Sequence, residues 1–82
     1  MTKYKTEFAN YQQTIKIPSN CNVITFVNNS TTVSFNVNNF PVLPGASFSV
    51  AGNEGEIDET EYNIDFGTTT TGSCWVIKKI NQ

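Results

Sequence analysis

The sequence predicts an all-β protein, a small antiparallel sandwich or barrel of six to seven short strands. Three observations support this prediction. Apolar and polar residues alternate along most of the chain, and Asn, Thr and Ser together supply 28 of the 82 residues. Turn signals separate the alternating runs at intervals of about eight to twelve residues. No run repeats apolar residues at spacings of three and four over a dozen positions, so no helix is expected.

The first part of the chain contains one ambiguous segment and two clear strands. Residues 1–11 are expected to form either an extended arm or a further strand. Residues 13–18, QTIKIP, alternate apolar and polar side chains and end at Pro18. Residues 22–29, NVITFVNN, carry apolar side chains on both faces, so both faces of this strand are expected to be covered.

A hairpin is predicted in the middle of the chain. Residues 33–37 and 40–42 alternate in the period of a half-buried strand. The pair Asn38-Asn39 between them tolerates positive φ, as a tight hairpin turn requires. Pro44-Gly45 marks a second tight turn, after which residues 47–50, SFSV, form the next strand.

Two more strands are predicted near the C-terminus. Residues 61–66, EYNIDF, alternate and stop at Gly67. Residues 73–80, SCWVIKKI, alternate before they end in lysines. The segment between them, GTTTTGS, is predicted to be a polar hairpin loop.

Length and composition indicate one domain over residues 1–82 whose core is only marginally stabilising. There is no His and no Arg, so the commonest general acid/base and the bidentate phosphate-binding side chain are missing. The net charge of −2 leaves no basic face for a nucleic acid. We therefore expect no enzymatic activity, no cofactor and no nucleic-acid partner, and we expect self-assembly to add stability.

The two cysteines, Cys21 and Cys74, are 53 positions apart and lack the paired spacing of a thiolate zinc site. The N-terminal residues contain no apolar run long enough for a signal peptide or a membrane span. We expect synthesis in a reducing cytoplasm, no contact with a membrane, and two free, buried thiols.

Five of the seven acidic residues lie between Glu54 and Glu61. The segment from Gly52 to Glu61 could be a calcium loop, a catalytic carboxylate pair or a solvated turn. A helix-flanked calcium loop needs an opening Asp, and a catalytic pair needs a cleft that so small a domain hardly offers. The turn is favoured, with Ile57 directed into the core and the acidic side chains in water. No metal-binding or catalytic residue is predicted here.

The run NNFPVLPGASFSVAGNEGEIDETEYNIDF, residues 38–66, joins a hairpin, a Pro-Gly turn, an acidic turn and a closing strand. It resembles a pattern found in small structural proteins of tailed bacteriophages that infect Bacteroidetes. The resemblance covers about a third of the chain and implies a virion accessory role, as a head decoration or tail-associated protein, without catalytic residues. Its markers are turn and core residues: Pro44, Gly45, Ser47, Gly52, Asn53, Ile57 and Tyr62.

The sequence thus favours a virion structural protein, made in the host cytoplasm, that binds a repeating capsid or tail lattice. It is expected to form a homo-oligomer, with a trimer favoured, and to contact a major virion protein through Tyr4, Phe8 and Tyr11. Packing of these three side chains on their own domain stays open. Two alternatives remain: a carbohydrate-binding adhesin module that uses Trp75, Tyr62 or Tyr11, and a cytosolic inhibitor that presents the acidic loop.

The interpretation of the acidic segment as a turn leads to a first prediction. Removal of divalent cations with EDTA should leave the melting temperature unchanged, and millimolar calcium should not raise it. A ligand that binds only the folded state must stabilise that state. A rise of several degrees with calcium, measured by calorimetry, would therefore restore the metal-site interpretation.

Overall fold

The structure, a computed structural model, describes residues 3–81 and confirms the all-β prediction. The structure contains the seven strands that the sequence predicts clearly and one more, β1. The eight strands of the described range are β1 (Tyr4–Tyr11), β2 (Ile15–Pro18), β3 (Val23–Asn28), β4 (Phe35–Val37), β5 (Phe40–Val42), β6 (Ser47–Ala51), β7 (Glu61–Asp65) and β8 (Cys74–Asn81).

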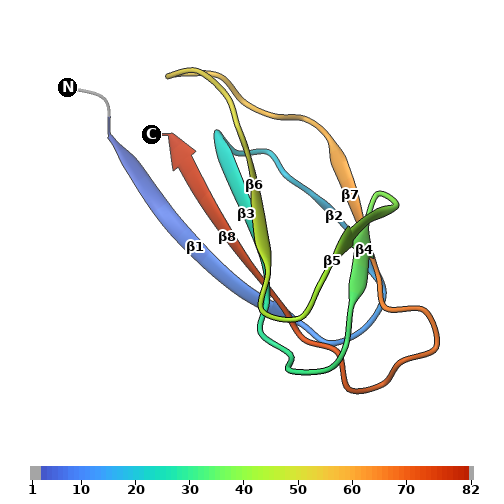
Figure 1. The fold of residues 1–82 in the computed structure, drawn as a ribbon. Helices are drawn as coiled ribbons and strands as arrows, with labels where there is room; N and C mark the ends of the chain where they lie inside the picture. The colour runs from blue at the N-terminus through green and yellow to red at the C-terminus, as the bar shows by residue number, and fades with distance from the viewer. Residues whose placement is uncertain (1–2, 82) are drawn as a thin grey trace.

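The strands form two four-stranded antiparallel sheets that face each other across the core (Figure 1). Sheet A has the order β1-β8-β3-β6, and sheet B has the order β2-β7-β4-β5. In Figure 1, sheet A lies on the left and sheet B on the right. The architecture is a small β-sandwich.

The chain changes sheet at six of its seven connections, because β4 and β5 alone are consecutive strands of one sheet. The loop at residues 67–73 is one of these crossings: it runs from β7 in sheet B to β8 in sheet A. The predicted hairpin at GTTTTGS is therefore wrong. The reason lies at the loop's two ends, where Phe66 and Cys74 are both buried and fill the core from opposite sheets. Gly72 makes the crossing possible, because a Cβ there would lie 2.3 Å from the Phe66 ring.

Residues 4–11 belong to the sandwich and are not a free arm. β1 pairs with β8 along its full length, from Tyr4 opposite Asn81 to Tyr11 opposite Cys74. The part of the arm interpretation that concerns residues 1 and 2 lies outside the described residues. Removal of this strand would uncover one side of β8, so β1 contributes to the fold itself.

The predicted hairpin at Asn38-Asn39 is confirmed. Both residues have positive φ, 48° and 69°, as a two-residue turn of this kind requires. Asn38 also joins the hairpin to β7, since its side-chain oxygen accepts a hydrogen bond from the Asn63 N–H at 2.7 Å. The turn thus fixes the order of strands β7-β4-β5 as well as its own loop.

The core is built on the inward face of β3. Ile24 and Phe26 are fully buried, and the Phe26 ring lies 5.2 Å from those of both Phe48 and Tyr62. These contacts join β3 to β6 within sheet A and to β7 across the core. Burial of aromatic surface of this kind supplies much of the stability of a small domain.

Asn28 continues the inward face of β3 but is an amide rather than an apolar side chain, and it is fully buried. Its Nδ2 donates to the carbonyls of Val33 (2.7 Å) and Val42 (3.0 Å), and its Oδ1 accepts from the N–H of Ser30 (2.9 Å). One side chain thus satisfies three backbone groups: the Val42 carbonyl in a buried contact, and the Val33 carbonyl and the Ser30 N–H in part-buried ones. Asn28 therefore holds the β3–β4 crossing against β5.

The two thiols are free and buried, as the sequence predicted. Burial raises the pKa of Cys74 to about 12 and raises that of Cys21 from its ordinary value. Both side chains therefore stay protonated at neutral pH and behave as small apolar groups.

The role of Asn28 can be tested by replacement with leucine. Asn28→Leu should lower the free energy of unfolding by about 3 kcal/mol, because it leaves the buried Val42 carbonyl and the part-buried Val33 carbonyl and Ser30 N–H without this partner. The measurement is urea unfolding followed by fluorescence. Asn36→Leu is the matched control, because Asn36 is exposed on β4, and this change should stay within about 0.5 kcal/mol of the wild type. Equal effects of the two changes would contradict the assignment.

Candidate interaction surface

The acidic loop at residues 52–60 is an anchored turn. Asn22, which is buried at the start of β3, donates from Nδ2 to the carbonyls of Asn53 (2.7 Å) and Glu56 (3.0 Å). Its own carbonyl accepts from the N–H of Gly52 at 3.0 Å. These hydrogen bonds support the interpretation of the segment as a turn. The side chain that anchors the turn, Asn22, lies outside it.

Near the end of this loop, the side chain that contacts the rest of the domain is that of Asp58 and not that of Ile57. Asp58 accepts hydrogen bonds from the Tyr62 hydroxyl (2.6 Å) and the Thr60 N–H (2.9 Å), and it forms a β-bridge with Cys21. The hydrogen bonds from Thr60 and Tyr62 lower the pKa of the Asp58 carboxyl. Ile57 is 62% exposed, so its predicted insertion into the core is wrong.

The carboxylates of the loop do not converge. Among residues 3–81, no group of three or more His, Cys, Asp or Glu side chains is arranged to hold a metal ion. Glu54, Glu56 and Glu59 are exposed, and Asp58 is occupied by Tyr62 and Thr60. The loop presents separate negative charges to solvent.

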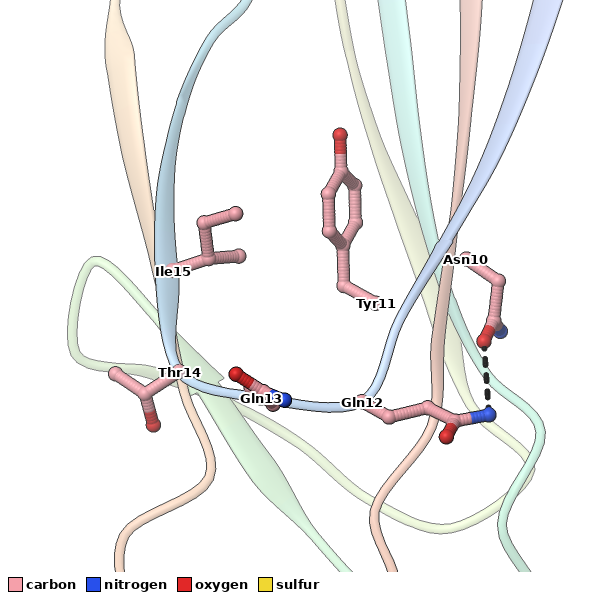
Figure 2. A pocket seen from close by; sticks show the side chains of 6 residues that line it. All are labelled: Asn10, Tyr11, Gln12, Gln13, Thr14 and Ile15. Carbon is pink, nitrogen blue, oxygen red and sulfur yellow. Dashed lines mark hydrogen bonds between the residues drawn. The ribbon is translucent and has the colours of Figure 1, made fainter.

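A hollow of about 390 Å³ lies where the chain crosses from β1 to β2 (Figure 2). Its lining consists of amides, hydroxyls and one aliphatic side chain: Asn10, Tyr11, Gln12, Gln13, Thr14 and Ile15. Figure 2 shows the Tyr11 ring and Ile15 standing beside each other between the strands, with Gln12 bonded to Asn10 at 3.2 Å. Tyr11 packs partly against the core, so its ring is not a free platform for a ligand.

The outer face of sheet A carries a row of apolar side chains, which we call the apolar strip: Tyr4, Phe8, Val27, Trp75 and Ile77. Phe8 lies opposite Ile77, and Trp75 lies opposite Val27 in the strand pairing. Their immediate neighbours Val76 and Phe26 point inward and are buried, so the strip faces away from sheet B. Phe8 is 65% exposed, Tyr4 59% and Trp75 39%, and within residues 3–81 no third layer covers them.

Polar contacts hold the two ends of the apolar strip in place. The Lys79 ammonium lies 4.9 Å from the centre of the Tyr4 ring, a cation–π contact. With the Asn29 amide turned so that its nitrogen donates to Ser73, its oxygen accepts from the Trp75 indole N–H at 3.2 Å. The aromatic side chains are thus oriented before any partner binds, which lowers the entropy lost on binding.

Of the three predicted contact residues, the structure brings Tyr4 and Phe8 together on the outer face and separates Tyr11 from them. The strand period explains this, because positions 4 and 8 share a face and position 11 does not. Trp75 was predicted only as a sugar-stacking residue of the adhesin alternative, and Val27 and Ile77 are parts of the strip that the sequence did not indicate. Tyr62 is buried with its hydroxyl bonded to Asp58, so it cannot stack on a sugar as the adhesin alternative allowed.

Comparison of the chain with protein-family models, with curated proteins and with solved structures gave no match. In the described range, no helix is long and apolar enough to cross a membrane.

The Asp58 anchor predicts a specific loss of stability in acid. Because hydrogen bonds lower the folded-state pKa of Asp58, its contribution is present above the unfolded pKa of about 3.9 and is lost as the pH falls through the lower folded value. Asp58→Asn should lower the midpoint of urea unfolding at pH 7. It should also make the midpoints at pH 7 and pH 2.5 more similar than they are in the wild type. Glu59→Gln, an exposed neighbour, should leave both midpoints near wild type. An unchanged pH dependence in Asp58→Asn would refute this role.

Proposed function

We propose that this chain is a non-enzymatic structural protein that attaches to a repeating protein lattice, the capsid or tail of a virion, through the apolar strip on sheet A. The observation that carries this proposal is the apolar strip on one sheet face, in which Tyr4, Phe8 and Trp75 are exposed and Val27 and Ile77 are half-buried. Monomeric proteins rarely leave a contiguous apolar face in water, and such faces commonly mark protein interfaces.

The composition of the strip fits a protein partner. Tyr, Trp and Phe are enriched in the centres of protein interfaces, where each aromatic side chain buries a large area with few rotatable bonds. The polar neighbours Thr25, Ser49 and Asn10 surround the aromatic residues, as a rim surrounds an interface centre. Attachment of many copies would multiply a modest single-site affinity.

The rest of the chain supports a structural role in place of catalysis. Within residues 3–81 the loop carboxylates form no group that could hold a metal ion, both thiols are buried and protonated, and the crossing from β1 to β2 is lined mainly by amides and hydroxyls. A rigid sandwich with an ordered apolar face is suited to cover a surface.

The attachment can be tested on purified particles from the cells that make this protein. Mass spectrometry should detect the chain in the particles. Phe8→Ser and Trp75→Ser should each weaken rebinding to particles that lack it by about 2 kcal/mol, roughly thirty-fold, since buried aromatic anchors dominate interface energies. Both side chains lie on the outer face of sheet A and leave the core intact, so both variants should stay folded at the temperature of the binding measurement. Leu43→Ser, also at an exposed apolar position but outside the strip, is the matched control and should bind like the wild type. If no particle contains the chain, the virion role is wrong.

One observation favours the inhibitor alternative. Ile57 is exposed among the carboxylates of the anchored loop, so an apolar contact and negative charge are presented together. Such a surface would suit a basic site with a small apolar pocket on a host protein. Capture of a cellular protein that Ile57→Ser abolishes and Phe8→Ser does not affect would support this alternative over the lattice.

A further inference from the structure

Strand β1 is the longest sheet edge without Pro or Gly in the part of the chain that the structure describes. Sheet A ends at β1 and β6, and sheet B ends at β2 and β5. The two edges of sheet B are short and carry Pro18 and Pro41, which cannot donate to a further strand. β6 has five residues and runs into Gly52, whereas β1 has eight residues and contains neither Pro nor Gly.

An open edge of this length can template another strand where its charges find partners, because one side of its backbone has unpaired N–H and C=O groups. The side chains of β1 are arranged about Thr6. Lys5 and Glu7 flank it on one face with opposite charges, and Tyr4 and Phe8 flank it on the other face with aromatic rings. All four are exposed. A two-fold rotation about Thr6 therefore places Lys5 at the position of Glu7, and Tyr4 at the position of Phe8.

We infer that β1 pairs antiparallel with β1 of a second copy of this chain, about a two-fold axis at Thr6. The two A sheets then become one continuous eight-stranded sheet. Lys5 of each copy lies opposite Glu7 of the other, Tyr4 lies opposite Phe8, and Thr6 lies opposite Thr6. Opposite charges, aromatic pairs and Thr–Thr pairs directly across two strands are all stabilising combinations.

The charges select this register over its neighbours. In one continuous sheet, directly opposite residues share a face, so the two-fold axis must pass through a residue position. An axis at Lys5 places two lysines opposite each other, which offsets part of the gain from its two Lys3–Glu7 pairs. An axis at Glu7 places two glutamates opposite each other and forms no opposite-charge pair. An axis at Phe8 leaves both charges without an opposite charge. The axis at Thr6 gives two opposite-charge pairs and no like-charge pair.

This contact goes beyond attachment to a lattice, because it involves the strand edge and needs no particle. A two-fold contact uses the same surface on both copies and closes at two. The inference therefore specifies a dimer in place of the trimer that the sequence favoured. In the dimer, the apolar strips of the two copies meet at Tyr4 and Phe8 and form one surface.

The test is the mass of the protein in solution, by sedimentation equilibrium without particles. The wild type should sediment as a dimer at micromolar to millimolar concentration. Lys5→Glu and Glu7→Lys should each weaken self-association roughly tenfold or more, because each creates two like-charge pairs across the axis. The double variant K5E/E7K exchanges the charges and should restore the wild-type dimer. Circular dichroism of each variant checks that the sandwich is folded.

A cross-link tests the position of the axis independently of the charges. Thr6→Cys should form a disulfide between copies under mild oxidation, since directly opposed Cβ atoms lie about 4.5–5.5 Å apart and a small shift brings the sulfurs together. Ser47→Cys, on the opposite edge of the same sheet face, is the matched control and should not cross-link. The buried native thiols should leave the wild type unlinked.

A wild-type protein that is monomeric at millimolar concentration, or trimeric, would overturn the inference. So would a double variant that stays as weak as the single ones, or a cross-link at position 47 and none at position 6. A dimer that binds no particle would leave this contact standing and remove the proposed lattice function, so the two outcomes are distinguishable.

Discussion

The fold depends on two buried amides at the ends of one strand. The chain crosses between the sheets at six connections, and these crossings bring backbone N–H and C=O groups to both ends of a core that is otherwise apolar. A buried backbone group without a partner costs about as much as a hydrogen bond contributes. Asn22 satisfies the acidic loop at one end, and Asn28 satisfies the β3–β4 crossing at the other. With Ile24 and Phe26 between them, the inward face of β3 is a short apolar core closed at each end by an amide.

Strand positions could be predicted from the sequence, but their assignment to sheets could not. The alternation of apolar and polar residues indicates which side chains share a face of one strand. This pattern predicts the strands from Ile15 onward. Alternation does not indicate which strand pairs with which. The pattern therefore predicts a hairpin at residues 67–73, where the chain in fact crosses from sheet B to sheet A. The close approach of Gly72 to Phe66 decides that connection, and only the three-dimensional structure contains it.

The same limit applies to the candidate surface. Tyr4 and Phe8 were predicted as contact residues, and strand parity in the sequence already separates Tyr11 from them. Trp75 and Val27 join the strip because β8 lies between β1 and β3, an order that no local pattern encodes. In the acidic loop, apolarity favoured Ile57 as the buried residue. The hydrogen bonds of Tyr62 and Thr60 to Asp58 instead direct the carboxylate toward the domain and leave Ile57 in water.

The two outer faces of the sandwich differ in a way that the core does not require. Both sheets bury apolar inward faces, yet the outer face of sheet B carries Lys16, Asn36 and Asn63, whereas that of sheet A carries the apolar strip. A sandwich that remained alone in water would be expected to have polar side chains on both outer faces, as antiparallel sheets with one solvated side usually do. The edges of the two sheets differ in the same sense. Sheet B has a proline in each of its edge strands, and the edge strand β1 of sheet A has none. The polar outer face and the edge prolines of sheet B suit exposure to solvent, and the apolar strip and the open β1 edge of sheet A are the two features on which the proposed contacts with other chains rest.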